Sequence, residues 1–118
     1  MKTNHSRGLV AELVAALLLQ AKCYRIIAKR QKTPVGEIDI IASRGNTLAI
    51  IEVKLRGNMD SSLESVSTRQ RQRLERAAGY YLAGKPQYIN KTVRFDFIAL
   101  APWRMPRHII SAWEAEEK

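Results

Sequence analysis

The stretch "GEIDIIASRGNTLAIIEVKLR", from Gly36 to Arg56, reads as two apolar strands joined by a tight turn. The turn is Gly45–Asn46, a dipeptide typical of two-residue hairpins, and the strands are predicted over residues 37–43 and 47–54. Four charged side chains interrupt these strands: Glu37, Asp39, Glu52 and Lys54. Burying a charge is costly unless a partner compensates it, so these residues mark a candidate site.

Hairpin geometry is expected to bring the four charged side chains together. With Gly45–Asn46 as the turn, Asp39 lies opposite Glu52. Glu37 likewise lies opposite Lys54, with opposed Cβ atoms about 4.5–5.5 Å apart. Because side chains alternate along a strand, all four are expected to project from one face of the sheet. Two carboxylates this close repel each other unless a proton, a lysine or a metal ion lies between them.

The alternative is a half-exposed hairpin whose polar face is simply solvated. The face of Asp39 and Glu52 also carries Ile41, Leu48 and Ile50. The opposite face carries Ile38, Ile40, Ala49, Ile51 and Val53. Because both faces are largely apolar, we predict central strands covered on both sides, with the charges clustered at one end. Such a cluster is more often a site than a solvated surface.

A cluster of carboxylates beside a lysine suits the chemistry of a hard cation. Mg²⁺ takes oxygen ligands and is typically held by one or two carboxylates together with substrate phosphate. The pattern therefore predicts Mg²⁺ or Mn²⁺ bound by Asp39 and Glu52. Lys54 is predicted to orient the attacking water or to stabilise charge developing on a phosphate.

The flanking sequence predicts one α/β domain over residues 1–118, with helices on a mixed sheet, in the order αβββαβ and a short final strand. Apolar residues at helical spacing predict a first helix over residues 7–22. Its buried stripe is expected to be Leu9, Val10, Leu13, Val14, Leu17, Leu18 and Ala21. The remaining strands are predicted over residues 24–29, 91–100 and 108–111.

The second helix is predicted to begin at a capping box, Ser67–Gln70, and to end at Gly84. Its buried face is expected to be Leu74, Ala77, Ala78, Tyr81 and Leu82. Outside these elements, Cys23 is expected in the core, and Trp103 and Trp113 are expected to pack the end of the core rather than to stack on bases. The chain closes with an acidic tail from about residue 114.

The charge balance favours a polyanionic partner. Twenty Lys and Arg against eleven Asp and Glu give a net charge of +9, which favours nucleic acid, although solubility alone is an alternative explanation. One basic stripe lies on the second helix: Arg69, Arg73 and Arg76, followed by Tyr80. A second basic run contains no acidic residue: Lys22, Arg25, Lys29, Arg30 and Lys32. These residues are predicted either to contact phosphates or to form an ordinary solvated face.

No segment resembles a cleavable signal peptide or an apolar membrane span of about 20 residues, so the cytoplasm is the expected location.

The hairpin motifs "GEIDIIA" and "LAIIEVKLR" resemble those of the YraN family of small bacterial proteins. The similarity extends over "AELVAALLLQAKCYRIIAKRQKTPVGEIDIIA", "VSTRQRQRLERAAGYYL" and "RFDFIAL", which cover most of the chain. That family is similar to Holliday-junction resolvases and, through them, to PD-(D/E)XK nucleases. The resemblance therefore implies a restriction-endonuclease-like, three-layer fold, and it also implies a homodimer.

The resemblance also implies roles for individual residues. Asp39 and Glu52 correspond to the metal-binding carboxylates of the nucleases, and Lys54 corresponds to their catalytic lysine. Glu12 corresponds to an acidic residue that some resolvases contribute from the first helix, although a solvent-flanking position is the simpler expectation. Glu37 belongs to the "GEID" signature and is a further candidate ligand. Gln70 replaces a lysine found in many relatives, so it is expected to cap the helix or to make a polar contact near the site.

Together these features predict a metal-dependent nuclease that hydrolyses phosphodiester bonds of DNA, including at branched structures. The alternative is a nucleic-acid-binding module of the same fold without significant catalysis. A third possibility is a basic adaptor for a protein partner. The complete set of Asp39, Glu52 and Lys54 favours the enzyme, because a pure binding module has no need of carboxylates facing phosphate.

Overall fold

The structure, a computed structural model, describes residues 2–55, 68–101 and 103–113, with side chains from residue 9 onward. Its elements in chain order are α1 (Lys2–Ala21), β1 (Arg25–Lys32), β2 (Glu37–Arg44), β3 (Thr47–Leu55), α2 (Thr68–Leu82), the 3₁₀ helix η2 (Pro86–Tyr88), β4 (Thr92–Leu100) and β5 (Arg107–Trp113). The predicted order is confirmed, including the final strand. The predicted cap at Ser67 and the acidic tail lie outside the described residues.

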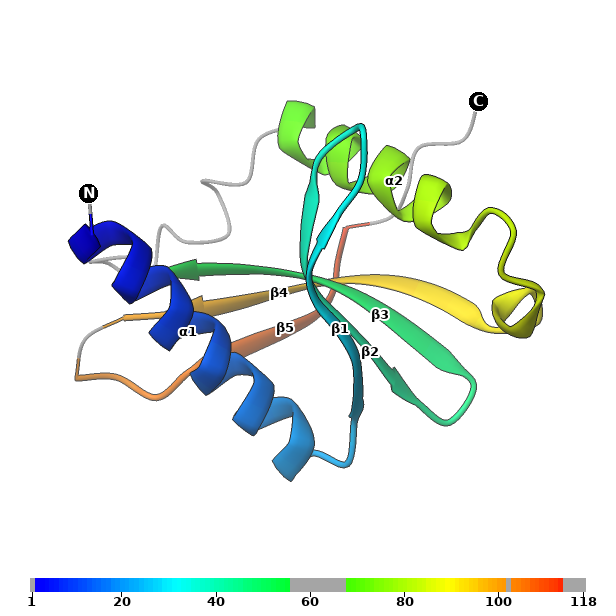
Figure 1. Cartoon of the computed structure of the whole chain (residues 1–118). Coiled ribbons are helices and arrows are strands. Elements are labelled where there is room, and N and C mark those ends of the chain that lie inside the picture. The colour runs from blue at the N-terminus through cyan, green and yellow to red at the C-terminus, as the bar shows by residue number, and fades with distance from the viewer. Residues whose placement is uncertain (1, 56–67, 102, 114–118) are drawn as a thin grey trace.

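The sheet has five strands in the order β1-β2-β3-β4-β5. β3 and β4 run parallel, with α2 in the connection between them, and the other neighbours are antiparallel. α1 covers one face of the sheet and α2 covers the other (Figure 1). This three-layer α/β architecture agrees with the restriction-endonuclease-like fold predicted from the sequence. Among the described residues, neither helix combines the length and the apolar character needed to cross a bilayer.

Both faces of the central hairpin are covered, as predicted. On the α2 side, Leu74, Ala77 and Ala78 pack against a buried layer of sheet residues that includes Ile41, Leu48, Ile50 and Phe97. On the α1 side, the buried sheet residues include Ile40, Ala42, Ala49 and Ile51. The turn at Gly45 (φ 58°) sets Arg44 opposite Thr47 and fixes the predicted register.

The predicted buried stripe of α1 is wrong for most of its members, although Val14 and Leu18 do pack against the core. Leu13 and Leu17 are 53% and 56% exposed, and Leu9 and Val10 are also exposed. The helix instead packs on the sheet through Ala11, Ala15, Ala16 and Leu19. Small alanine side chains allow close packing between helix and sheet, and this requirement overrides the larger apolar stripe. The same rotation turns Glu12 partly toward the protein interior.

The outer part of the β1–β2 hairpin bends away from the sheet and rises beside α2 (Figure 1). Ile40 packs on the α1 side, but Ile38 packs on the α2 side, so regular alternation fails at Asp39 between them. Opposite Asp39 in the ladder, Arg30 takes a left-handed conformation (φ 53°), which breaks the pleat of β1. The prediction that Ile38 and Ile40 share a face is therefore wrong.

Two further core predictions fail. Cys23 is exposed and left-handed (φ 71°), because it lies in the turn that ends α1, and Tyr24 enters the core instead. Trp113 is buried and stacks on Phe95 with ring centroids 5.6 Å apart, as expected. Trp103 does not pack against the core; it is fully exposed.

The orientation of α1 can be tested by two substitutions on its opposite sides. Ala15→Leu enlarges a fully buried side chain, so it is expected to lower the free energy of unfolding by about 1–3 kcal/mol. Leu13→Gln changes an exposed side chain and is expected to change the free energy of unfolding by less than about 0.5 kcal/mol. Urea unfolding of both variants measures the difference. A larger loss for Leu13→Gln than for Ala15→Leu would show that α1 docks through the stripe predicted from the sequence.

Candidate functional site

Asp39 is the centre of the candidate site, because it lies where β2 separates from β3. The last β2–β3 pair is Ile40 with Ile51. Beyond that pair, the backbone amide of Val53 donates a hydrogen bond to Oδ2 of Asp39 at 2.8 Å. The carboxylate of Asp39 thus accepts the hydrogen bond that a backbone carbonyl of β2 would otherwise accept from Val53. This bond holds the carboxylate at the point where β2 and β3 separate.

Carboxylates from two other positions meet Asp39. One oxygen from each of Glu12, Glu37 and Asp39 lies within 4.8 Å of the other two. Glu12 comes from α1 and Glu37 from the start of β2, so the cluster joins a helix to the bent hairpin. The expectation that Glu12 flanks solvent is wrong: its side chain is only 14% exposed and forms a 3.4 Å ion pair with Arg30.

The predicted pair of Glu52 and Lys54 lies beside this cluster. Nζ of Lys54 is 3.1 Å from Oε2 of Glu52. Both side chains line a pocket of about 120 Å³ between the hairpin and α2, whose other lining residues are Gly36, Glu37, Gln70, Arg73, Leu74 and Ala77. Glu52 is also close enough to hydrogen-bond Asp39. The structure therefore brings Asp39, Glu52 and Lys54 together, as predicted. The β2–β3 ladder ends at Ile40 and Ile51, however, so the predicted pairing of Glu37 with Lys54 does not form, and Glu37 pairs with Lys32 of β1 instead.

Asp39 carries an uncompensated electrostatic cost. Burial, together with the nearby negative charge of Glu52, raises the pKa of Asp39 from 3.8 to about 8. A hydrogen bond with Glu52 and the charge of Glu12 raise this pKa further, and the bond from the Val53 amide opposes them only in part. At neutral pH the carboxyl group is therefore held protonated until a positive charge arrives beside it.

These donors fit a hard divalent cation. All four side chains, Glu12, Glu37, Asp39 and Glu52, offer carboxylate oxygens, which Mg²⁺ and Mn²⁺ prefer over nitrogen or sulfur. The oxygens of Glu12, Glu37 and Asp39 lie close enough together to share one ion, which would tie α1 to β2. Glu52 of β3 lies beside Asp39 but outside that group. Burial and the charge of Glu52 raise the pKa of Asp39 even though Glu12 pairs with Arg30 and Glu52 pairs with Lys54. A cation bound at Asp39 would favour its ionised form.

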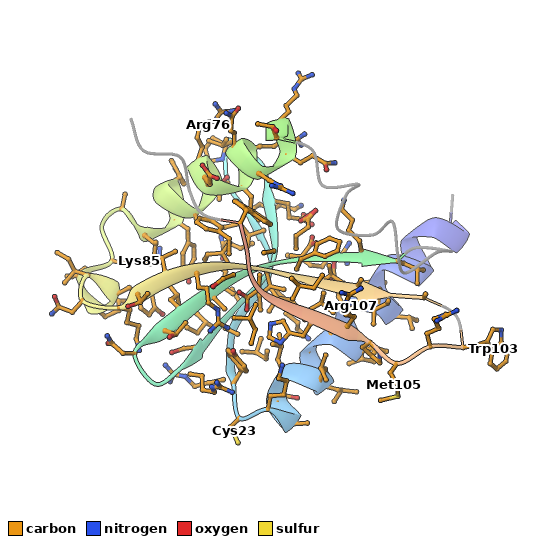
Figure 2. All side chains as sticks on the ribbon, turned by 180° about the vertical axis from the view of Figure 1, so that it is seen from behind. Cys23, Arg76, Lys85, Trp103, Met105 and Arg107 are labelled. Atoms are coloured by element: carbon orange, nitrogen blue, oxygen red, sulfur yellow. The ribbon has the colours of Figure 1, made fainter. Side chains whose placement is uncertain are left out.

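The predicted basic stripe on α2 lies on the surface next to this pocket. Arg69, Arg73 and Arg76 are all exposed, and Figure 2 shows Arg76 pointing away from the body of the protein. Arg73 also lines the pocket, and its stem lies so close to Gly36 that a Cβ there would come within 2.9 Å of its Cδ. Gln70 lines the same pocket, which agrees with a polar contact near the site.

The predicted basic run, which extends from Lys22 after α1 along β1, divides into exposed and engaged residues, and Arg25 is exposed. Lys29 and Lys32 are exposed. Lys32 also lines a shallow pocket with Tyr80 of α2, so this end of the hairpin adjoins the stripe. Arg30 is paired with Glu12, and Nζ of Lys22 is 2.6 Å from Nδ1 of His108. Arg30 and Lys22 therefore have structural partners that the sequence pattern did not reveal.

A polar network on the other side of the sheet is predicted from the sequence only in part: Arg94 and Asp96 share a strand face and pair as expected, but the contributions of His108 and Ser111 were missed. Asp96 is fully buried and accepts two hydrogen bonds from Arg94, one from Nε2 of His108 and one from the amide of Ser111. Burial alone would raise the pKa of Asp96, but the hydrogen bonds from His108 and Arg94 outweigh it and hold this pKa below its usual value. The signal in the sequence was an aspartate inside the apolar strand "RFDFIAL", which required partners from elsewhere.

Comparison with known proteins places these residues in a family context. The profile of "Uncharacterised protein family UPF0102" matches residues 11–100. A UPF0102 protein of Parvibaculum lavamentivorans is 48% identical over 106 residues, which cover 90% of this chain and 80% of that protein. One from Paramagnetospirillum magneticum is 47% identical over 114 residues, covering 93% of this chain and 88% of its own length.

The raised pKa of Asp39 gives a pH-dependent test of the cluster in metal-free protein. Between pH 3.8 and about 8 the folded protein keeps the proton on Asp39 whereas the unfolded chain releases it. The free energy of unfolding therefore falls as pH rises through this window. Asp39→Asn removes the effect and keeps an acceptor for Val53. We expect its stability advantage over the wild type, measured by urea unfolding in a chelator, to grow up to about pH 8. An advantage that is constant with pH would contradict the assignment.

Proposed function

We propose that this chain, which belongs to the UPF0102 (YraN) family, is a metal-dependent nuclease that hydrolyses phosphodiester bonds of DNA. The observation that carries the proposal is the convergence of Glu12, Glu37 and Glu52 on Asp39, next to Lys54. Like charges are gathered at an energetic cost that folding alone does not require. Sites with such perturbed carboxylates are candidates for catalysis.

The residues of the site have separable roles in this proposal. Asp39, held by the Val53 amide, and Glu52 are the principal ligands of Mg²⁺ or Mn²⁺, and Glu12 and Glu37 supply further oxygens. When bound, such a cation lowers the pKa of water and neutralises charge on a phosphate. Lys54 lies against Glu52 at the pocket, where its ammonium group orients water or contacts the phosphate.

The basic surface explains how a polyanion would reach the carboxylates. We define it as the exposed residues Arg69, Arg73, Arg76, Lys29 and Lys32. Arg73 belongs both to this surface and to the pocket wall, so a phosphate chain bound along α2 would pass the site. Phosphate contacts of this kind supply affinity and position without reading sequence.

The alternative function is a nucleic-acid-binding module of the same fold that does not cut. It shares the basic surface but gives no reason for the cost of the acidic cluster. Preference for branched DNA, which the substrate panel below tests, and the homodimer remain predictions.

The proposal is tested by Glu52→Gln, with Glu75→Gln as a matched control. Glu75 of α2 accepts a hydrogen bond from Nε1 of Trp113. Its substitution therefore removes the same charge outside the carboxylate cluster and leaves an acceptor. Wild-type protein should cut a panel of duplex, single-stranded and four-way-junction DNA when Mn²⁺ or Mg²⁺ is present. Glu52→Gln should lose at least about a hundredfold in rate, since even partners outside a coordination shell cost 10- to 100-fold.

Two further readouts separate catalysis from binding. Mn²⁺ at a hundredfold excess over its Kd should stabilise the wild type and Glu75→Gln by about 2.7 kcal/mol, and Glu52→Gln by much less. Glu52→Gln should still bind DNA, whereas Arg69→Gln with Arg73→Gln should weaken binding and leave the Mn²⁺ response intact. Absence of cleavage in the wild type, together with retained DNA binding, would favour the binding module.

A further inference from the structure

The turn between β4 and β5 presents an aromatic side chain to solvent. Trp103 is fully exposed and Met105 nearly so, and Figure 2 shows both pointing away from the body of the protein. A tryptophan is the largest apolar side chain, and leaving it in water forfeits the free energy that its burial would supply. Trp113, the other tryptophan of the chain, shows that the fold can bury such a ring.

The backbone holds Trp103 in this position. The amide of Arg104 donates to the carbonyl of Ala101 at 3.3 Å, which closes a tight turn. Within that turn Trp103 has a left-handed φ of 63°, where glycine is the usual residue. Strain of this kind persists where the surrounding structure imposes it, and it is concentrated at functional positions.

The turn lies at the same end of the sheet as the candidate site. β3 and β4 are parallel, with Lys54 paired to Ala99 and Leu55 paired to Leu100. Trp103 follows Leu100 by three residues, so the turn lies beyond the carboxyl ends of both strands (Figure 1). Ala99, the partner of Lys54, is four residues before Trp103. Because four extended residues span at most about 14 Å, Trp103 lies within reach of a nucleic-acid chain bound at Lys54.

Charge around the turn identifies the kind of partner. Arg104 and Arg107 are exposed on either side of Met105, and the sequence from residue 101 to residue 113 contains no acidic residue. Two cationic side chains are therefore interspersed among the apolar side chains from Trp103 to Arg107. A single nucleic-acid strand has the complementary alternation of flat bases and phosphate charges, and a base stacked on an aromatic ring gains affinity whatever its sequence.

We propose that Trp103 is a stacking platform for an unpaired base, and that Arg104 and Arg107 hold the neighbouring phosphates. The inference rests on the proposed nuclease function and narrows its substrate to nucleic acid with a single-stranded segment next to the cut site. It assigns to the turn a role in substrate choice that is independent of the carboxylates.

Binding in a chelator tests this platform without cleavage. The probes are an oligothymidylate of about 15 nucleotides and an abasic oligomer of the same length, which carries the same phosphates without bases. The oligothymidylate should quench tryptophan fluorescence in the wild type but not in Trp103→Phe. Trp103→Ala should weaken oligothymidylate binding by roughly 5- to 100-fold and leave abasic binding unchanged. Ile89→Ala, which truncates another exposed apolar residue near η2, should change neither the fluorescence quenching nor the binding of either probe.

Two outcomes would overturn the inference. One is equal binding of both probes by Trp103→Ala and the wild type. The other is a Trp103-dependent blue shift with phosphatidylglycerol vesicles but no response to the oligothymidylate, which would identify a membrane-contacting turn.

Metal-dependent cleavage that is unaffected by Trp103→Ala would leave the nuclease proposal standing while this inference fails. Quenching without any cleavage would support the platform while the nuclease proposal fails.

Discussion

The bend of the β1–β2 hairpin at Arg30 and Asp39 is the constraint on which the site depends. A left-handed residue in β1 ends the regular pleat, and the backbone amide of Val53 then takes a side-chain acceptor in place of a strand partner. Because Asp39 supplies that acceptor, its carboxylate cannot turn away to solvent without leaving an amide unpaired. The bend also directs the start of β2 toward α2, which creates the wall of the pocket.

The protein treats its two interior aspartates in opposite ways. Asp96 receives hydrogen bonds from Arg94, His108 and Ser111, so its charge is compensated and its pKa is lowered. Asp39 faces other carboxylates, and its pKa is raised because burial and the charge of Glu52 both disfavour ionisation. The first arrangement is complete without a ligand. The second is completed only by a proton or a cation, which is why we assign function to that end of the sheet.

The sequence predicts features that neighbouring residues determine, and it fails for features that depend on how distant elements pack. The register from Arg44–Thr47 to Ile40–Ile51 follows from the local turn chemistry of Gly45–Asn46, and the sequence predicts it correctly. Asp39 lies just beyond the last of these pairs. The sequence does not predict the approach of Glu12 to Asp39, because it depends on which face of α1 meets the sheet. Alanines fit against the sheet better than the leucine stripe that includes Leu13. The exposure of Trp103 was also missed, since apolar composition predicts burial and only the turn conformation prevents it.

An anomalous difference map from crystals grown with Mn²⁺ would show whether the carboxylates around Asp39 form a cation site. We expect one strong peak within coordination distance of Asp39, about 2.0–2.3 Å, shared with at least one of Glu52, Glu12 and Glu37. We also expect the Lys54 ammonium group to remain beside Glu52. A map with no peak at Asp39, or with Mn²⁺ bound only at other acidic side chains, would show that these carboxylates are not a cation site.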